Sequence, residues 1–302
     1  VFILRGLELM RSVRWFTVLL LVASTVFAQD RAAEQRTAFT RAQHLRHGIN
    51  ASEWFAQSAS DYSAARTNRY TDDSDIALMA KLGFDNVRLS IDPVPLQQGH
   101  DHQGQYADFI SRLDHVVDKI IADGLAVQVD IHPEPSYKAQ VRESSEGVDR
   151  FVMLWRRLAA HYADRDPDLV FFEIMNEPEQ TDPYRWAGIQ ARAAAAIREV
   201  APKNTIIATG PNWSGIADLL TLHPLPDGNV IYTFHFYQPS DFTPQGASWG
   251  TDWHIYTHGI QFPAAEDSLA ASLQQVPNPR DRYNFEHSWL DHWDAHRIRL
   301  LM

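Results

Sequence analysis

Chemically competent side chains stand where five apolar segments of this sequence end. The five groups are Arg88, Asp130-Ile131-His132-Pro133, Asn176-Glu177-Pro178, Gly210-Pro211-Asn212-Trp213 and His235-Phe236-Tyr237. A single arginine or histidine at such a position is usually structural, but five competent ends in succession are hard to assign to packing. The sequence has no glycine-rich phosphate loop and no G-x-S-x-G elbow, so nothing in it indicates phosphate binding or acyl transfer.

The segments that must position these groups are typical of buried parallel strands. They are apolar, rich in β-branched residues and nearly continuous, as a sheet covered on both faces requires. The expected strands cover residues 47–51, 84–90, 125–131, 169–175, 204–209 and 230–236.

Helical periodicity fills the stretches between these strands. One predicted helix begins at Asp72-Asp73 and ends near Gly83. Three others span residues 106–121, 151–162 and 186–200. Successive strand starts from residue 84 onward are 41, 44, 35 and 26 residues apart. A βα unit of an eightfold barrel averages about 30 residues. The pattern therefore predicts an α/β protein with a (β/α)8 TIM barrel, of which the chain covers about the first six βα units. The competing doubly wound sheet usually carries a G-x-G-x-x-G turn, which is absent.

Composition excludes several classes of function. The 302 residues include 27 Lys and Arg against 38 Asp and Glu, a formal charge of −11, so nucleic acid is not expected as a partner. The absence of cysteine excludes disulfides, thiol catalysis and zinc–thiolate sites.

The N-terminal segment is typical of a secretory leader. A short basic stretch begins at Met10, an apolar run follows over 15–23, and small residues precede an expected cleavage after Ala28. The apolar run is shorter than the roughly 20 residues that a membrane span needs, so no stable membrane anchor is expected. We therefore divide the chain into 1–28, upstream residues plus signal peptide, and 29–302, one catalytic barrel. The mature protein is expected to be secreted, periplasmic or extracellular, and monomeric.

The segment Phe172-Glu173-Ile174-Met175-Asn176-Glu177-Pro178 resembles the "N-E-P" strand end of glycoside hydrolase family 5, the cellulase-type members of the retaining (β/α)8 glycosidases. The resemblance runs from about Gly48 to the last residues. It implies that Glu177 is the general acid/base and that Asn176 bonds the sugar 2-hydroxyl. The family's strand-two arginine, strand-three histidine and strand-six pair match Arg88, His132, His235 and Tyr237.

Glycoside hydrolysis fits these residue types. The leaving oxygen must be protonated by a carboxylic acid, and a retaining enzyme places a second carboxylate about 5–5.5 Å away. In this interpretation Arg88 keeps the second carboxylate ionised and Tyr237 donates to it. Sugars stack on aromatic rings, so Trp213 is a candidate for substrate binding, and Trp54, Trp249 and Trp253 are weaker candidates.

The family's nucleophile, a glutamate that ends the seventh strand, is not found in the sequence. Glu286 has no apolar strand before it, Glu266 falls at a helix start, and Glu173 is assigned to the barrel interior. Glu134 is at most a subsite residue. We therefore expect the chain to be truncated before its nucleophile, which would lie beyond residue 302.

The predicted function is a secreted endo-β-1,4-glucanase that acts on β-glucan by retaining double displacement. A β-mannanase or another β-glucanase is the alternative among enzymes, and a non-catalytic carbohydrate-binding fragment is the alternative of another class. No cofactor and no metal are expected. The pairs His254/His258 and His292/His296 are assigned to solvated helix faces because no third ligand accompanies them.

Overall fold

The computed structural model describes residues 30–58, 61–97, 105–263, 266–289 and 293–301. The expected signal peptide over 10–28 lies outside these residues. Contacts divide the chain into two compact units, 1–234 and 235–302, which we describe separately. The expectation of one catalytic barrel over 29–302 stays a prediction. No helix in the described ranges is both long and apolar enough to cross a membrane.

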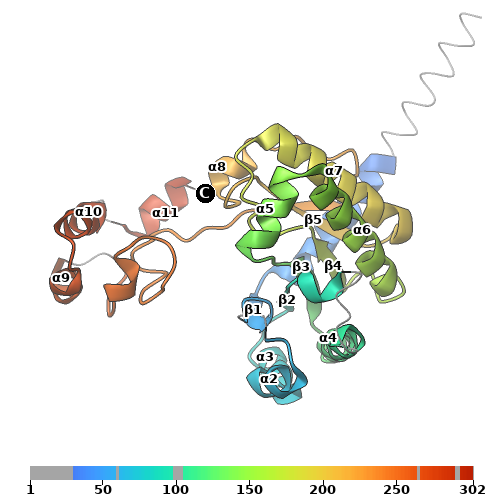
Figure 1. The fold of residues 1–302 in the computed structure, drawn as a ribbon, viewed down its shortest axis with the longest axis horizontal. Coiled ribbons are helices and arrows are strands. Elements are labelled where there is room, and N and C mark those ends of the chain that lie inside the picture. Colours follow the sequence, from blue (N-terminus) through green and yellow to red (C-terminus); the bar gives the residue numbers. More distant parts are fainter. Residues whose placement is uncertain (1–29, 59–60, 98–104, 264–265, 290–292, 302) are drawn as a thin grey trace, which may run out of the picture. The chain divides into compact units, whose positions relative to one another are not determined.

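The first unit contains a six-stranded parallel sheet (Figure 1). Its strands are β1 (Gly48–Phe55), β2 (Asn86–Ile91), β3 (Ala126–Ile131), β4 (Val170–Glu173), β5 (Thr205–Thr209) and β6 (Val230–Thr233). Each strand pairs with the next one along the chain, in the order β1-β2-β3-β4-β5-β6. All six predicted strands are therefore present, in the sequential order that a (β/α) barrel requires.

Helices alternate with these strands in the first unit. They are a helix over 30–41, η1 (Ala42–Leu45), α2 (Ala64–Tyr70), α3 (Asp73–Lys81), η2 (Val94–Leu96), α4 (Gln105–Ala122), α5 (Pro135–Glu143), α6 (Ser145–Tyr162), α7 (Pro183–Val200) and α8 (Ile216–Leu219). The predicted start of α3 is confirmed, because Asp72 caps it by accepting from the backbone N–H groups of Ser74 and Asp75. The sequence did not indicate α2 or α5.

Alternate residues of each strand face two different environments. Val87, Val129 and Phe172 belong to the large cluster that packs against the helices. Ala126 and Phe171 belong to a smaller cluster on the other face. This second face also carries polar side chains, so the strands alternate more than their near-continuous apolar sequences suggest.

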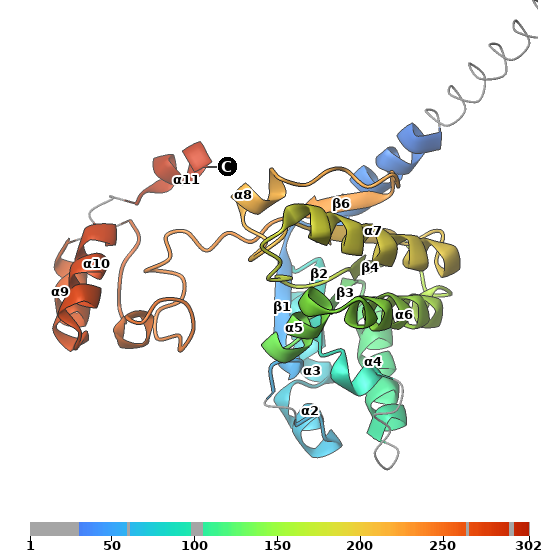
Figure 2. The ribbon, with the colours of Figure 1, turned by 45° about the horizontal axis from the view of Figure 1, so that its top comes forward.

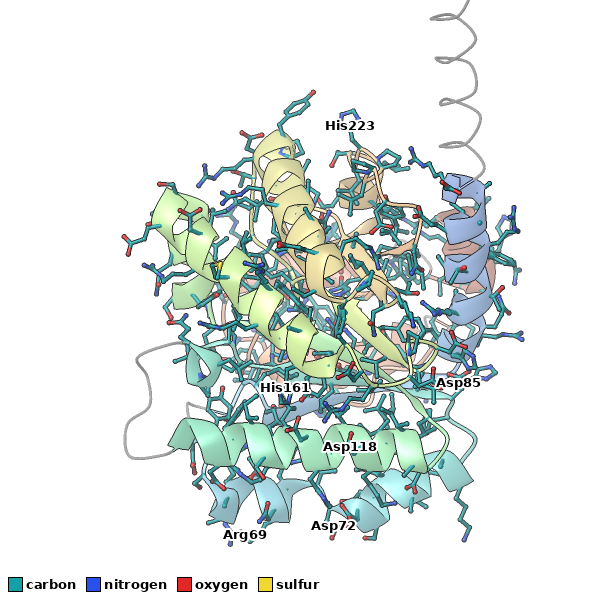
Figure 3. All side chains as sticks on the ribbon, turned by 90° about the vertical axis from the view of Figure 1, so that its right-hand side faces the viewer. Arg69, Asp72, Asp85, Asp118, His161 and His223 are labelled. Atoms are coloured by element: carbon teal, nitrogen blue, oxygen red, sulfur yellow. The ribbon has the colours of Figure 1, made fainter. Side chains whose placement is uncertain are left out.

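The helices α4, α6 and α7 cover the outer face of the sheet. The helices α6 and α7 lie side by side (Figure 2). Ion pairs link neighbouring helices: Nε2 of His161 on α6 lies 2.7 Å from Oδ1 of Asp114 on α4, and Nη2 of Arg156 on α6 lies 2.7 Å from Oε1 of Glu199 on α7. Figure 3 shows His161 between α6 and α4. Such exposed pairs contribute little, so burial of the apolar faces holds these helices on the sheet.

Two tryptophans tie these helices to the ends of strands. Trp155 on α6 is fully buried and its indole N–H donates to the carbonyl of Ile174 at 2.8 Å. Trp186 on α7 donates in the same way to the carbonyl of Thr209 at 2.8 Å. Both bonds hold backbone at the carboxyl ends of β4 and β5, where the predicted site residues follow.

The second unit contains η3 (His254–Tyr256), α9 (Glu266–Gln275), α10 (Pro279–Trp289) and α11 (Ala295–Leu301). A small core of Ile260, Leu269, Val276 and Phe285 holds it together.

We expect Trp155→Phe to lower the free energy of unfolding by about 1–3 kcal/mol, because the carbonyl of Ile174 loses its buried donor while most of the ring remains. Denaturant unfolding measures this change. The control is Met153→Ala on the same helix, which is 47% exposed and is expected to change stability by no more than about 0.5 kcal/mol. Equal effects of the two substitutions would contradict the role assigned to Trp155.

Candidate active site

Arg88 lies in the middle of β2 and carries the central cation of the inner face. Its Nε and Nη2 atoms donate to the two carboxylate oxygens of Glu173, each at 2.7 Å. Nη2 also lies 2.9 Å from Oδ2 of Asp130. Both carboxylates are fully buried. One guanidinium thus faces two carboxylates, in the bidentate geometry that makes such contacts strong.

Arg88 lies nearer the middle of its strand than the sequence suggested. The sequence suggested an arginine at the end of the strand that serves a second catalytic carboxylate. The structure places Arg88 three residues before the end of β2, and the carboxylates that it brings to the guanidinium are Glu173 and Asp130. That Arg88 keeps a second catalytic carboxylate ionised stays a prediction.

Four side chains form a closed ring of hydrogen bonds. Oδ1 of Asn176 accepts from Nη2 of Arg88 at 3.1 Å, and Nδ2 of Asn176 lies 3.1 Å from Nε2 of His132. Nδ1 of His132 lies 3.0 Å from Oδ2 of Asp130, the oxygen that also binds Arg88. The structure therefore brings three of the predicted residues, Arg88, His132 and Asn176, into one network.

The donors in this ring determine its protonation pattern. Arginine can only donate, so the oxygen of the Asn176 amide must face Arg88 and its NH2 group must face His132. Nε2 of His132 is then the acceptor, and its Nδ1–H donates to Asp130. The ring leaves the second N–H of the Asn176 amide for another acceptor, and it holds His132 in one tautomer.

Glu177 follows Asn176 directly and has a strained backbone. Its φ is 43°, in the left-handed region that non-glycine residues rarely adopt, and Glu179 has a φ of 54°. The N–H of Asn176 donates to the carbonyl of Ile131 at 2.9 Å, which ties this loop to the end of β3. Such strain costs on the order of 1–3 kcal/mol per residue and clusters at functional sites. The half-buried Glu177 is therefore held in a defined position.

Trp213 lies on the loop after β5 and is 62% exposed. The residues on both sides of it are also left-handed, with φ of 50° at Asn212 and 57° at Ser214. Two backbone hydrogen bonds join this loop to the loop of Glu177: Glu179 N–H to Asn212 O at 2.8 Å, and Asn212 N–H to Gln180 O at 3.0 Å. An exposed indole is thus attached to the segment that carries Glu177.

Trp54 is placed in the core. It is 3% exposed, its indole N–H donates to the carbonyl of Thr67 at 2.9 Å, and its ring packs at 5.1 Å against that of Phe55. A side chain with so little exposed area offers almost no surface on which a sugar could stack. The structure therefore corrects the suggestion that Trp54 binds substrate.

The predicted strand-six pair belongs to the second unit. The rings of His235 and Tyr237 lie 6.5 Å apart, and Tyr237 packs edge-on against Trp249 at 5.7 Å. Trp249 is 57% exposed. Trp253 is only half-buried but donates its indole N–H to the buried Asp241 at 2.8 Å. Within this unit, three of the predicted residues therefore form one aromatic group, and Trp253 is engaged in packing.

The paired histidines are placed differently from the sequence interpretation. His254 is 2% exposed in the short η3, and its Nδ1 accepts from the N–H of Thr251 at 3.3 Å, so its assignment to a solvated helix face is wrong. His258 and His296 are exposed, and His292 lies outside the described residues. No cluster of three or more metal-ligating side chains occurs in the described part of the chain.

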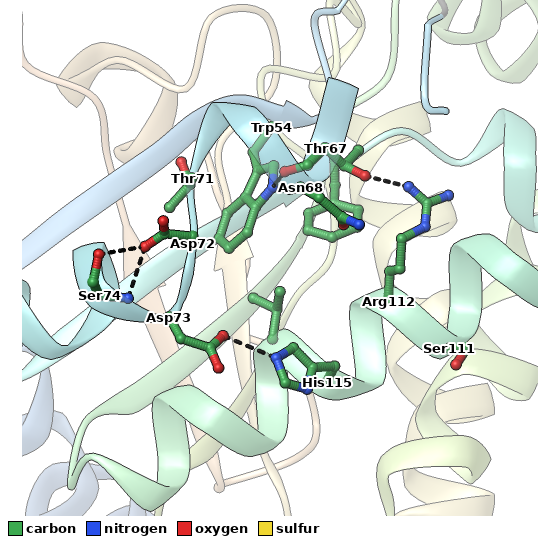
Figure 4. Close-up of a pocket in the computed structure, with 12 residues that line it drawn as sticks. Trp54, Thr67, Asn68, Thr71, Asp72, Asp73, Ser74, Ser111, Arg112 and His115 are labelled. Carbon is green, nitrogen blue, oxygen red and sulfur yellow. Dashed lines mark hydrogen bonds and ion pairs between the residues drawn. The ribbon is translucent and has the colours of Figure 1, made fainter. Parts of the chain in front are cut away.

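A cavity of about 670 Å³ lies among α2, α3 and α4 (Figure 4). Trp54 is among the residues that line it, and Nε2 of His115 lies 2.8 Å from Oδ1 of Asp73 beside it. None of the four residues of the hydrogen-bonded ring (Arg88, Asp130, His132 and Asn176) lines this cavity. A second cavity, of about 440 Å³, lies on the inner face and includes Arg88 and Gln128 in its lining.

Sequence reasoning missed Asp130 and Glu173 as members of the site. Asp130 was noted as a strand end and Glu173 was assigned to the interior. The two residues are register partners on adjacent strands. Acidic residues at inward positions of neighbouring strands, next to an inward arginine, are the signal that could have identified both.

We expect Arg88→Met to lower the free energy of unfolding by about 3–5 kcal/mol, because it leaves two buried carboxylates without their cation. The matched control is Arg156→Met, which removes an exposed ion pair and is expected to cost at most about 1 kcal/mol. Chemical denaturation measures both variants. A loss at Arg88 no larger than that at Arg156 would mean that the buried cluster does not depend on the guanidinium.

The chain is similar in sequence to known enzymes that act on cellulose-type polysaccharides, according to their names. The chain is 29% identical over 245 residues to endoglucanase C of Acetivibrio thermocellus, covering 79% of this chain and 69% of that one. It is 33% identical over 214 residues to cellodextrinase A of Ruminococcus flavefaciens, covering 68% and 62%.

Solved structures of the endoglucanase Cel5A of Thermotoga maritima match 84% of this chain and 77% of theirs, at 27% identity. The TM-score is 0.62 for one of them and 0.63 for another, which is a complex with mannotriose; a further structure is a complex with cellobiose.

The model of the family described as Cellulase (glycosyl hydrolase family 5) matches residues 48–294. This range crosses the boundary between the two units. The predicted (β/α)8 architecture, covered here for about six units, is confirmed by these matches. The chain belongs to the cellulases of glycosyl hydrolase family 5 and is a glycoside hydrolase.

Proposed function

We propose that this protein is an endo-β-1,4-glucanase that cleaves β-glucan by retaining double displacement, with Glu177 as the acid/base. One observation carries the proposal: the ring of Arg88, Asp130, His132 and Asn176 fixes an amide directly beside a strained, half-buried glutamate. A preorganised donor next to a carboxyl group suits a reaction in which charge develops on a sugar ring.

In the first step, Glu177 gives its proton to the glycosidic oxygen as the bond to the anomeric carbon breaks. A second carboxylate attacks that carbon and forms a glycosyl ester, which a water molecule hydrolyses after giving its proton to Glu177. The second N–H of the Asn176 amide, left over by the ring, would donate to the sugar 2-hydroxyl and strengthen as positive charge develops. We assign Tyr237 as a donor to the second carboxylate, with His235 as its neighbour.

The exposed indole of Trp213 would give a sugar ring a flat apolar surface close to Glu177. Trp249 would offer another exposed indole surface within the second unit. Trp54 is left out because its ring is packed. Trp253 is also left out because its indole is held by Asp241.

The preferred substrate is inferred from the relatives. Two of them are named as an endoglucanase and a cellodextrinase, and the Thermotoga endoglucanase forms a complex with cellobiose. Its complex with mannotriose favours a second candidate, β-mannan, on the same barrel. Both polymers present β-1,4 links with flat sugar faces, so the same acid/base and indole would serve either one.

We also propose that the protein is exported as a monomer and that residues 10–28 direct this export. N-terminal sequencing of protein recovered from the periplasm or the medium is expected to begin at Gln29, because the small residues before it suit signal peptidase. Retention of the uncleaved segment in a membrane fraction would contradict the proposal.

The direct test of function is Glu177→Gln in the full-length protein, with reducing ends measured on carboxymethylcellulose. Loss of the acid/base is expected to lower kcat by at least about a hundredfold, because an amide cannot protonate the leaving oxygen. The control, Glu199→Gln, removes an exposed carboxylate of α7 and is expected to leave the rate unchanged.

Unchanged activity of the Glu177 variant would exclude Glu177 as acid/base. Binding of cello-oligosaccharides without hydrolysis by the parent protein would indicate a carbohydrate-binding role instead. Parallel rates on cellulose, lichenan and mannan separate the glucanase from the mannanase, and a higher rate on mannan would overturn the first choice of substrate.

A further inference from the structure

Lys138 is a buried cation near the candidate active site that the reaction steps do not use. It lies on α5, is 5% exposed, and its Nζ donates to Oε1 of Glu179 at 3.0 Å. Removing a lysine from water is costly unless its charge is matched and hydrogen-bonded. The buried position of Lys138 therefore requires the ion pair with Glu179, which offsets the cost of removing the charge from water.

Glu179 links this cation to the loop of the acid/base. It lies two residues after Glu177, in a left-handed conformation that its surroundings must enforce. Its N–H donates to the carbonyl of Asn212 at 2.8 Å, so its backbone holds the loop after β5 while its side chain holds α5. Arg142, one turn further along α5, approaches the other carboxylate oxygen at 3.8 Å.

Trp213 receives the other contact of Lys138. Nζ lies 6.0 Å from the centre of the indole, within the range of a cation–π interaction. The loop that presents the indole is closed by Asp218, which accepts from the side chain of Asn212 at 3.0 Å and from the N–H of Gly215 at 2.9 Å. The backbone of this loop is thus fixed, and Lys138 is the charged group placed against the exposed ring.

We propose that Lys138 is a positioning residue for sugar binding, which holds the Trp213 indole in place while its pair with Glu179 keeps the loops after β4 and β5 in register. This inference rests on the proposed function, because it takes the ligand to be a β-1,4-linked glucan chain. Its consequence is a contribution to affinity for the chain and not to the bond-breaking step.

The test measures binding of cellopentaose to the full chain in the Glu177→Gln background, where turnover is suppressed. Lys138→Met keeps the length of the side chain but removes its charge, and it is expected to raise Kd by about fivefold. Arg142→Met is the matched control: it removes a cation from the same helix and the same glutamate but not from the indole, and Kd is expected to stay within about twofold. Lys138→Arg is expected to retain most of the affinity because it keeps the charge.

A double-substitution cycle separates positioning from general damage. In a Trp213→Ala background, Lys138→Met is expected to have no further effect on Kd, because the ring that it positions is gone. An undiminished effect there, or equal effects of Lys138→Met and Arg142→Met, would overturn the proposal. If Lys138→Met does not fold, the same cycle is carried out with Lys138→Gln, and the same two outcomes decide.

A measurement without ligand keeps this proposal separate from the proposed function. The measurement is quenching of tryptophan fluorescence by acrylamide. The part of this quenching that disappears in Trp213→Phe comes from Trp213. Lys138→Met is expected to increase that part because the indole becomes less restrained. No change in this quenching would overturn the positioning role even in a protein that binds glucan. Failure of the parent protein to bind or cleave glucan would count against the proposed function, with the quenching result still deciding the role of Lys138.

Discussion

The inner face of the sheet is organised around one half-buried arginine, Arg88. A guanidinium in the middle of β2 is tolerable only with carboxylates at hydrogen-bond distance, and adjacent strands supply Glu173 and Asp130 in the required register. Because Asp130 is shared between Arg88 and His132, satisfying the arginine also orients the imidazole. The imidazole and the arginine together leave the amide of Asn176 one orientation. Charge balance inside the sheet thus determines the geometry beside Glu177.

Strain in the loops is offset by contacts from the surrounding scaffold. Glu177 and Glu179 both have left-handed backbones, which the chain would abandon without outside support. Support comes from backbone hydrogen bonds between the loops after β4 and β5, and from the indoles of Trp155 and Trp186, which hold carbonyls at the ends of these strands. The fully packed outer layer therefore does more than bury apolar area: it fixes the ends from which the reactive loops depart.

The residues predicted for the site occur in both compact units of the chain. Arg88, His132, Asn176 and Glu177 are held by the parallel sheet of the first unit, where burial and hydrogen bonding specify each side chain. His235, Tyr237 and Trp249 form an aromatic group at the start of the second unit, in which the rings of Tyr237 and Trp249 are exposed.

The sequence by itself determined the strands, their order and the segment around Glu177, because apolar periodicity and the N-E-P strand end are local signals. Local signals also indicated a capped helix after Asp72. Only the tertiary structure decided which side chains meet. It showed Arg88 paired with Glu173 and Asp130, and it placed Trp54 and His254 in cores, because partners on other strands and helices are not encoded at any fixed spacing. The same reason applies to Lys138, whose charge is meaningful only beside a glutamate 41 residues away.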